Sequence, residues 1–183
     1  MMSGVRLSRP TRCVVAVMFL TAVIAACGND TSGPLELQGH GGMTADPVAR
    51  GVWFRTSGCL STESEPADVM ITGITTSPTS DHVSTRVTWN DGSPVVIAKH
   101  GQPPVAYKPV TQTTHTGGTL DGCSLDVAVV LSPDTAPVVV RDVTVDYEVD
   151  GKAYSARTTL DVTLCPARTR ASVSGGCSEP ASP

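Results

Sequence analysis

The stretch "VVVRDVTVDYEVDGKAYSARTTLDVTLC", residues 138–165, decides the fold class. Apolar residues alternate with polar ones in its first half, which is the two-residue period of a strand with one buried face. Asp150-Gly151 is a pair that favours the type I′ turn of two-residue hairpins. This turn would place four pairs opposite each other: Val149 and Lys152, Tyr147 and Tyr154, Val145 and Ala156, Val143 and Thr158. Pattern and register therefore predict the same antiparallel hairpin, with an apolar face that continues through Leu160, Val162 and Leu164.

Further strand signals precede this hairpin and are separated by turn residues. They lie at residues 51–55, 68–76, 82–90, 94–100, 104–110 and 123–132, of which the fifth contains prolines and suits an edge strand. With the hairpin they predict an all-β fold, an antiparallel β-sandwich of about seven or eight short strands over residues 49–165. An immunoglobulin-like topology is one option, although the Cys-Trp-Cys spacing of antibody domains is not present.

The core of this sandwich should be aliphatic. The chain has only two Trp, three Tyr and two Phe, so Val, Leu, Ile and Ala must fill most of the interior. Within residues 123–132 every second residue from Cys123 to Leu131 is apolar, which predicts that one face of this strand is buried.

The charge of the chain argues against a nucleic-acid partner. Three of its 13 basic residues, Arg6, Arg9 and Arg12, lie within residues 1–26, a stretch that contains no acid. The rest of the chain has 10 basic and 17 acidic side chains, a balance of −7. A nucleic-acid-binding surface would need a basic patch, so that class of partner is excluded.

Residues 1–26 have the organisation of a secretory signal peptide. Residues 1–12 are polar and basic, and residues 13–26 are apolar and uncharged. A helix of this apolar length would span about 21 Å, less than the roughly 30 Å hydrocarbon core of a bilayer. A basic region, a short apolar region and small residues at its end favour a removable leader over a membrane anchor.

The end of this leader resembles a lipobox. Ile24-Ala25-Ala26-Cys27 is similar to the motif of bacterial lipoproteins, in which a branched aliphatic residue and two small residues precede a cysteine. The resemblance covers only residues 1–27. It implies that cleavage follows Ala26, that Cys27 carries a diacylglyceryl group, and that the protein is anchored on the extracytoplasmic face of the bacterial cell membrane. Two or three acyl chains are enough to hold a domain stably on a membrane.

Two segments outside the sandwich are expected to lack regular structure. Residues 27–48 are rich in Gly, Pro and polar residues and predict a flexible tether with a reach of about 25 Å. His40 and Met43 within it could bind a soft metal ion, but an incidental pair is the preferred interpretation. Residues 166–183 form a Ser/Pro/Gly-rich tail that only Cys177 would pin to the domain.

The cysteines predict two disulfides. Cys13 leaves with the leader and Cys27 is the lipid site, so an even set of four remains in an exported chain. The expected strand directions place Cys123 and Cys165 at opposite ends of the sandwich, so a bond between these two is disfavoured. The preferred pairing is Cys59–Cys123 with Cys165–Cys177, and Cys59–Cys165 with Cys123–Cys177 stays open. A four-cysteine zinc site is disfavoured because the CxxC pairs of such sites are missing.

No known catalytic or cofactor motif occurs, so no cofactor is expected. The histidines are scattered over polar segments, and no Cys has the neighbours of a blue-copper site. Four acids of the hairpin could bind Ca²⁺ or a basic partner, but a solvated outer face is preferred. These acids are Asp142, Asp146, Glu148 and Asp150, and the histidines are His40, His82, His100 and His115.

The segment 99–109, "KHGQPPVAYKP", is the best candidate for a binding surface, through His100, Tyr107 and Lys108. Loops at the ends of a sandwich commonly carry recognition. The sequence thus predicts a non-enzymatic binding or structural module whose partner is an unidentified envelope protein or glycan. A small cell-envelope enzyme or an enzyme accessory subunit is the alternative, and a metal-binding envelope protein is a further one.

Overall fold

The computed structural model describes the chain in eight stretches, all built from strands and their connections. The leader, Ala26, Cys27, His40 and His115 lie outside the described residues, so the structure does not test the predictions made for them. No helix in the described part is long and apolar enough to cross a membrane. The described residues are 33–39, 42–46, 51–61, 66–89, 97–110, 116–167, 169–171 and 176–178.

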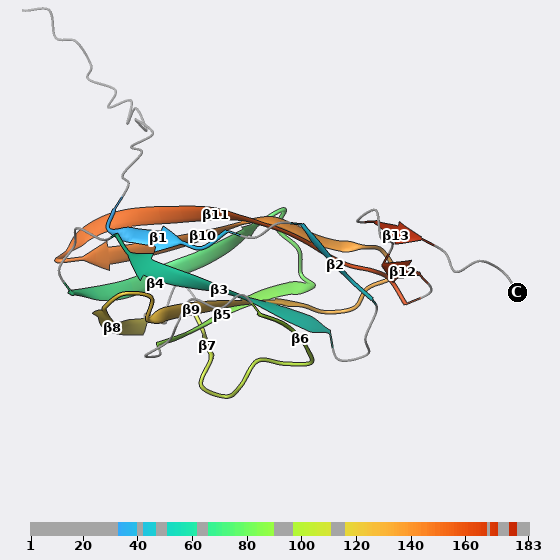
Figure 1. Ribbon diagram of the computed structural model, residues 1–183, viewed down its shortest axis with the longest axis horizontal. Coiled ribbons are helices and arrows are strands. Elements are labelled where there is room, and N and C mark those ends of the chain that lie inside the picture. The colour runs from blue at the N-terminus through green and yellow to red at the C-terminus, as the bar shows by residue number, and fades with distance from the viewer. Residues whose placement is uncertain are drawn as a thin grey trace, which may run out of the picture. The chain divides into compact units, whose positions relative to one another are not determined.

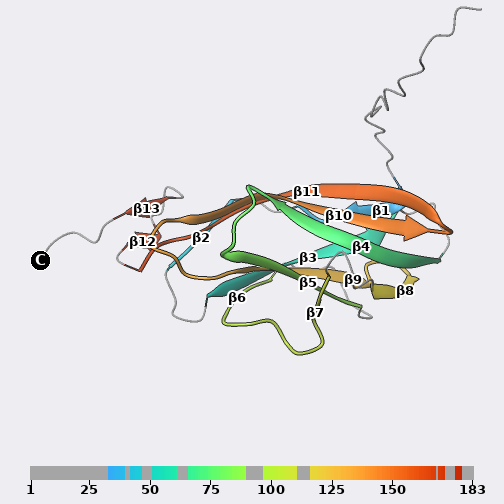
Figure 2. The same ribbon diagram turned by 180° about the vertical axis from the view of Figure 1, so that it is seen from behind.

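Two β-sheets pack face to face, which confirms the predicted all-β sandwich (Figure 1). The view from behind shows the same two layers (Figure 2). Sheet A has the strand order β1 (Leu35–Leu37), β3 (Val52–Leu60), β9 (Leu125–Leu131), β5 (Val83–Trp89) and β7 (Lys108–Pro109), and β6 (Ile97–His100) also pairs with β3. Sheet B has the order β2 (Met43–Ala45), β11 (Lys152–Leu164), β10 (Val138–Val149), β4 (Ala67–Ser77) and β8 (Thr116–Leu120).

The strand order is that of an immunoglobulin-like sandwich. Strands β1-β3-β9-β5 follow the A-B-E-D order of such domains, and β11-β10-β4 follow the G-F-C order. Strands β6, β7 and β8 lie between the D and E equivalents in the chain. Several strands of two to five residues, among them β1, β2 and β8, come in addition to the predicted ones because so short a stretch shows no clear period.

The β10–β11 hairpin has the predicted register. All four expected pairs are present, from Val149 with Lys152 to Val143 with Thr158. Asp150 and Gly151 have φ angles of 52° and 74°, and the type I′ turn requires positive φ at both central residues. The apolar face of the hairpin is buried in the aliphatic core between the sheets, where Tyr147 is the largest fully buried side chain.

The prediction of a flexible tether over residues 27–48 is wrong for its described part. Strand β1 pairs with β3, and β2 pairs in parallel with β11, so residues 33–39 and 42–46 run along the side where the two sheets meet. Leu35 is only 4 % exposed, and its backbone N–H donates to the Tyr147 hydroxyl at 3.2 Å. A single buried leucine and shared backbone hydrogen bonds thus outweigh the polar composition of this segment.

The two disulfides of the preferred pairing are present. Cys59 at the end of β3 bonds to Cys123 just before β9, with a Cα–Cα distance of 3.9 Å. This bond joins neighbouring strands of one sheet, whereas the disulfide of antibody domains joins the two sheets. Cys165 bonds to Cys177 and holds the small hairpin of β12 (Arg170–Ala171) and β13 (Cys177–Ser178) against the end of β11.

Candidate functional site

The segment between β6 and β7 crosses the outer face of sheet A. Strand β6 pairs with β3 and β7 pairs with β5, and these two strands flank β9. The connection, residues 101–107, must therefore pass from one side of β9 to the other, and it projects from sheet A in both views (Figure 1; Figure 2). We call these residues the β6–β7 loop.

Tyr107 fixes this loop to the sheet. Its side chain is 7 % exposed, and its ring lies 5.5 Å from the ring of Trp53, centroid to centroid, at an interplanar angle of 60°. Ala128 and Val130 of β9 complete a small second core around these rings. Tilted aromatic pairs at this separation attract each other in addition to the area that they bury.

This second core corrects the prediction for β9. Alternation predicted one buried face, but all seven residues of the strand are buried. The core-facing residues pack between the sheets, and Ala128 and Val130 on the outer face are covered by the loop. The sequence period could not show this, because the covering residue comes from a distant part of the chain.

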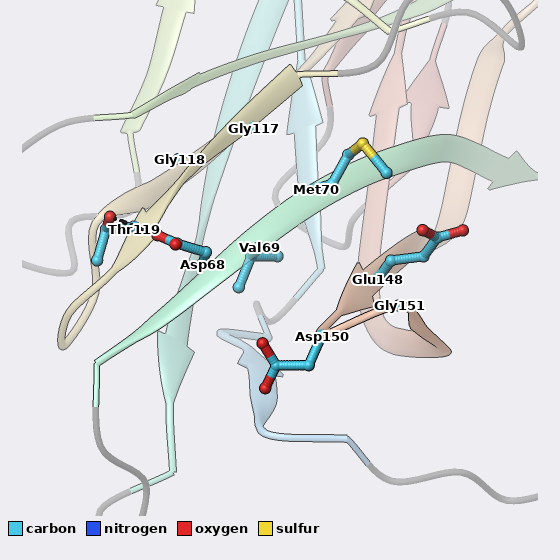
Figure 3. Close-up of a pocket in the computed structure, with 9 residues that line it drawn as sticks. All are labelled: Asp68, Val69, Met70, Gly117, Gly118, Thr119, Glu148, Asp150 and Gly151. Carbon is cyan, nitrogen blue, oxygen red and sulfur yellow. Dashed lines mark hydrogen bonds between the residues drawn. The ribbon is translucent and has the colours of Figure 1, made fainter.

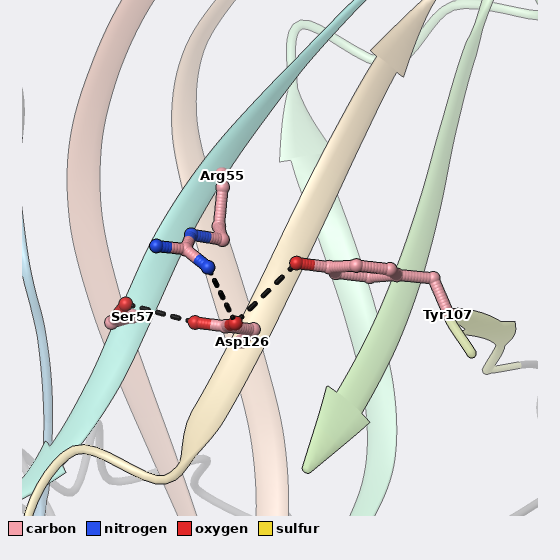
Figure 4. Close-up of polar contacts among 4 residues, drawn as sticks. All are labelled: Arg55, Ser57, Tyr107 and Asp126. Carbon is pink, nitrogen blue, oxygen red and sulfur yellow. Dashed lines mark hydrogen bonds and ion pairs between the residues drawn. The ribbon is translucent and has the colours of Figure 1, made fainter. Parts of the chain in front are cut away.

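A buried carboxylate lies under the same loop (Figure 4). Asp126 is 1 % exposed and accepts three hydrogen bonds or ion pairs. Arg55 contacts its Oδ2 at 3.0 Å, Ser57 donates to its Oδ1 at 2.9 Å, and the Tyr107 hydroxyl donates to Oδ2 at 3.4 Å. A buried charge is stable only when paired and hydrogen-bonded, and these partners satisfy Asp126.

Burial and the nearby negative charge of Asp126 raise the pKa of Tyr107 above its usual value, and burial is the larger cause. The phenol therefore keeps its proton at neutral pH and remains a donor to Asp126. Sequence reasoning missed Asp126, although an acid within the apolar run "LDVAVVL" was a visible signal. Its role as the attachment point of the loop emerges only from the strand register.

The tip of the loop is held from both sides while its apolar residues face solvent. The Gly101 amide donates to the Gly51 carbonyl at 2.9 Å, and the Tyr107 amide donates to the Pro104 carbonyl at 3.0 Å. Between these points Pro104, Val105 and Ala106 are exposed, and Val105 is 96 % exposed. Val105 is the one large hydrophobic residue that is exposed among the described residues.

The structure divides the predicted binding residues into two groups. His100 and Lys108 are exposed, at the end of β6 and in β7 respectively. The prediction that Tyr107 lies on the surface is wrong, because its ring is buried against Trp53 and its hydroxyl is bonded to Asp126. Tyr107 positions the tip and does not form part of it.

Cations gather on the outer face of sheet A. Side chains directly opposite each other in an antiparallel pair share a face. Lys99 is opposite Trp53 and Arg86 is opposite Ala128, so both project to the side that the loop crosses. Lys108 is exposed at the edge of the same sheet, but it is opposite the core-facing Val87 and does not project to that side.

The outer face of sheet B carries the opposite charge. Asp142 pairs with Arg157 at 2.9 Å, and Ser155 donates to Asp146 at 2.9 Å. Across the described residues, no group of three or more His, Cys, Asp or Glu is placed to hold a metal ion. The acidic side chains of this face are Asp68, Asp142, Asp146 and Glu148.

A shallow hollow of about 350 Å³ opens beside these acids, between β4, β8 and the β10–β11 turn (Figure 3). It is lined by Val69, Met70 and the glycines of β8, with Asp68, Glu148 and Asp150 around it. The hollow exists because Gly117 pairs with Met70 and has no side chain to cover the space.

The two glycines of β8 differ in their surroundings. A Cβ on Gly118 would lie 2.6 Å from the Trp89 ring, so this glycine permits close packing of the core. A Cβ on Gly117 would approach only the Val69 carbonyl, at 3.8 Å, so this position can accept a side chain.

The described histidines do not converge on a pocket. His82 contacts Asp134 at 3.4 Å and links two loops, and His100 is exposed on β6. Neither the β4–β8 hollow nor a second one beside β1 and β11 is lined by a described histidine or cysteine. The described residues of both hollows thus offer no candidate nucleophile–base pair of Cys and His.

Comparison with known proteins gives no family for this chain: no family model matches its sequence, and no curated protein matches it.

Proposed function

We propose that the protein is a lipid-anchored extracytoplasmic binding module whose contact surface is the tip of the β6–β7 loop. The observation that carries this proposal is the contrast within the loop. Val105 is 96 % exposed, whereas Tyr107, two residues later, is 7 % exposed and bonded to the buried Asp126. The loop is built to present an apolar tip in a fixed position.

A fixed tip supports binding for a thermodynamic reason. Ordering a loop upon association lowers affinity, so a loop that is already held in place loses less conformational entropy when it binds. Lys99 and Arg86 project to the side of sheet A that the loop crosses and could pair with acidic groups of a partner. Trp53 and Tyr107 are buried, so the contacts on offer are aliphatic and cationic, which suits a protein partner better than stacking on a sugar ring.

Two features support an extracytoplasmic, anchored location. The lipobox-like Ile24-Ala25-Ala26-Cys27 ends a signal-peptide-like leader. Both disulfides join cysteines of the domain, and disulfides persist mainly in oxidising compartments.

The anchor is tested by Cys27→Ala in the full chain. We expect the unprocessed precursor to accumulate and the labelled lipid to be lost, both visible as a mobility shift and loss of label on a gel. A Cys27→Ala protein that is processed and fractionates with the membrane as the wild type does would refute the lipid anchor. Ser3→Ala in the leader is the control and should process normally.

The binding surface is tested by site-specific photocrosslinking in intact cells. A photoreactive residue replaces Val105, and a matched one replaces Thr135, which is exposed in the β9–β10 connection. We expect covalent adducts from position 105 and few from position 135. Equal adduct yields from both positions, or none from position 105, would overturn the proposal.

A further inference from the structure

We propose that the loop tip of one copy docks into the β4–β8 hollow of a second copy, so that the protein associates head to tail. This inference rests on the proposed function, because it takes the tip as the contact surface and names its partner. The docked residues are Pro104, Val105 and Ala106.

The two surfaces match in polarity. The tip offers Val105 and its neighbours as an apolar projection, and the hollow, a space of about 350 Å³, offers the half-buried Met70 beside the backbone of the β8 glycines; the Val69 side chain is only 2 % exposed and belongs to the core between the sheets. Burying the aliphatic tip there would remove apolar surface from water on both copies.

The two surfaces also match in charge. Lys99 and Arg86 project from the outer face of sheet A, the side that the loop crosses, and three carboxylates, Asp68, Glu148 and Asp150, surround the hollow. Opposite charges at the rim of an interface steer association and set its register. The chain as a whole is acidic, so most random contacts between copies are repulsive, and this pair of faces is an attractive exception.

The arrangement of the two surfaces predicts the form of the assembly. The tip lies on the outer face of sheet A and the hollow on the outer face of sheet B, so the contact joins two different patches. Such heterologous contacts give rings or open rows.

The contact should be weak for a free pair of domains. A tip of three residues with two cations on the same face would bury less than the roughly 1,200 Å² of surface that stable interfaces need. Confinement of lipidated chains to a membrane raises their effective concentration, so the membrane is the place to look for association.

The test is the photoreactive residue at position 105 in the full lipidated chain. We expect an adduct of twice the chain mass, with the crosslink mapped by mass spectrometry to residues 68–70 or 117–119 of the second copy. Lys99→Glu with Arg86→Glu should lower the adduct yield at least about tenfold, since like charges would then face each other. Asp68→Lys with Glu148→Lys should do the same.

The decisive step is to express the two charge-reversed chains together. The acidic tip of the first chain then meets the basic hollow of the second chain. The unchanged basic tip of the second chain meets the unchanged acidic hollow of the first, so the adduct yield should recover. Gly117→Leu fills the hollow at a position with free space and should abolish the adduct. Asp81→Lys, in an exposed turn away from the hollow, is the control and should leave it unchanged.

Each other outcome overturns a defined statement. Adducts only with a different protein would refute self-association and leave the binding module standing. No adduct of any kind would refute both proposals. A self-adduct that survives both charge reversals and Gly117→Leu would refute the hollow as the docking site.

Discussion

The attachment of the β6–β7 loop can be measured by truncating Tyr107 in two steps. Tyr107→Phe keeps the ring against Trp53 and removes only the 3.4 Å hydrogen bond to Asp126. Asp126 retains Arg55 and Ser57, so no buried charge is left alone. We expect a loss of about 1 kcal/mol in the free energy of unfolding, less than the about 1.5–3 kcal/mol of an ordinary bond to a charged group because this bond is long.

Tyr107→Ala should cost considerably more, because it removes a buried aromatic ring. Such truncations cost about 3–5 kcal/mol in a closed core. Here the loop can lift off and expose Ala128 and Val130, so the loss in global stability should be about 3 kcal/mol. Urea unfolding with intact disulfides, followed by tryptophan fluorescence, gives both values, and Trp53 reports on the contact directly.

Hydrogen exchange separates lifting of the loop from global unfolding. In Tyr107→Ala the amides of residues 101–107 should exchange faster, while those of β10 change only with global stability. If the alanine and phenylalanine variants lose the same stability within about 0.5 kcal/mol, the ring does not anchor the loop and the argument for a fixed tip fails.

High pH should weaken the wild type more than Tyr107→Phe. The pKa of Tyr107 is raised above 10.0 by burial and by Asp126, so its contribution to stability is present below that pH and lost as the pH rises through the folded pKa. If urea titrations show that the wild type and Tyr107→Phe lose the same free energy of unfolding between pH 8 and pH 11, this reasoning is wrong. Gly118→Ala should lower the free energy of unfolding by about 1–3 kcal/mol through overpacking, and Gly117→Ala by less than about 1 kcal/mol. Thermal melting that shows Gly117→Ala to be the less stable variant would contradict the packing described for β8. Replacing Cys59 and Cys123 by serine opens a 64-residue loop and should cost about 4 kcal/mol, and loss of the tail disulfide, whose cysteines are 12 residues apart, should cost about 3 kcal/mol. A urea midpoint that falls more for the tail disulfide would contradict this ranking.

The hairpin could be predicted from the sequence because its information is local. The period of β10 and the Asp150-Gly151 turn sit within 28 residues, and each specifies the same register. Strand direction disfavoured a bond between Cys123 and Cys165 but left two pairings open, and the preferred one is present.

The candidate site could be predicted only in part because it is assembled from distant segments. His100 and Lys108 were found as exposed residues near prolines, but the burial of Tyr107 depends on Trp53 and Val130, far away in the chain. The opposite charges of the two outer faces follow from strand pairing, which the sequence did not specify for β3, β5 and β6. Short strands such as β1 are too brief to show a period.

The pairing of β1 and β2 with the sandwich changes what a lipid on Cys27 would do. Only five residues, 28–32, separate that cysteine from the first described residue. Fully extended, this stretch spans at most about 21 Å, compared with about 70 Å for the 20-residue tether expected from composition. The volume that the domain could explore around its anchor falls by a factor of about 40, since volume scales with the cube of these lengths. If Cys27 carries the lipid, a domain held so closely stays near the membrane, and the partners within its reach are those that lie at the membrane surface.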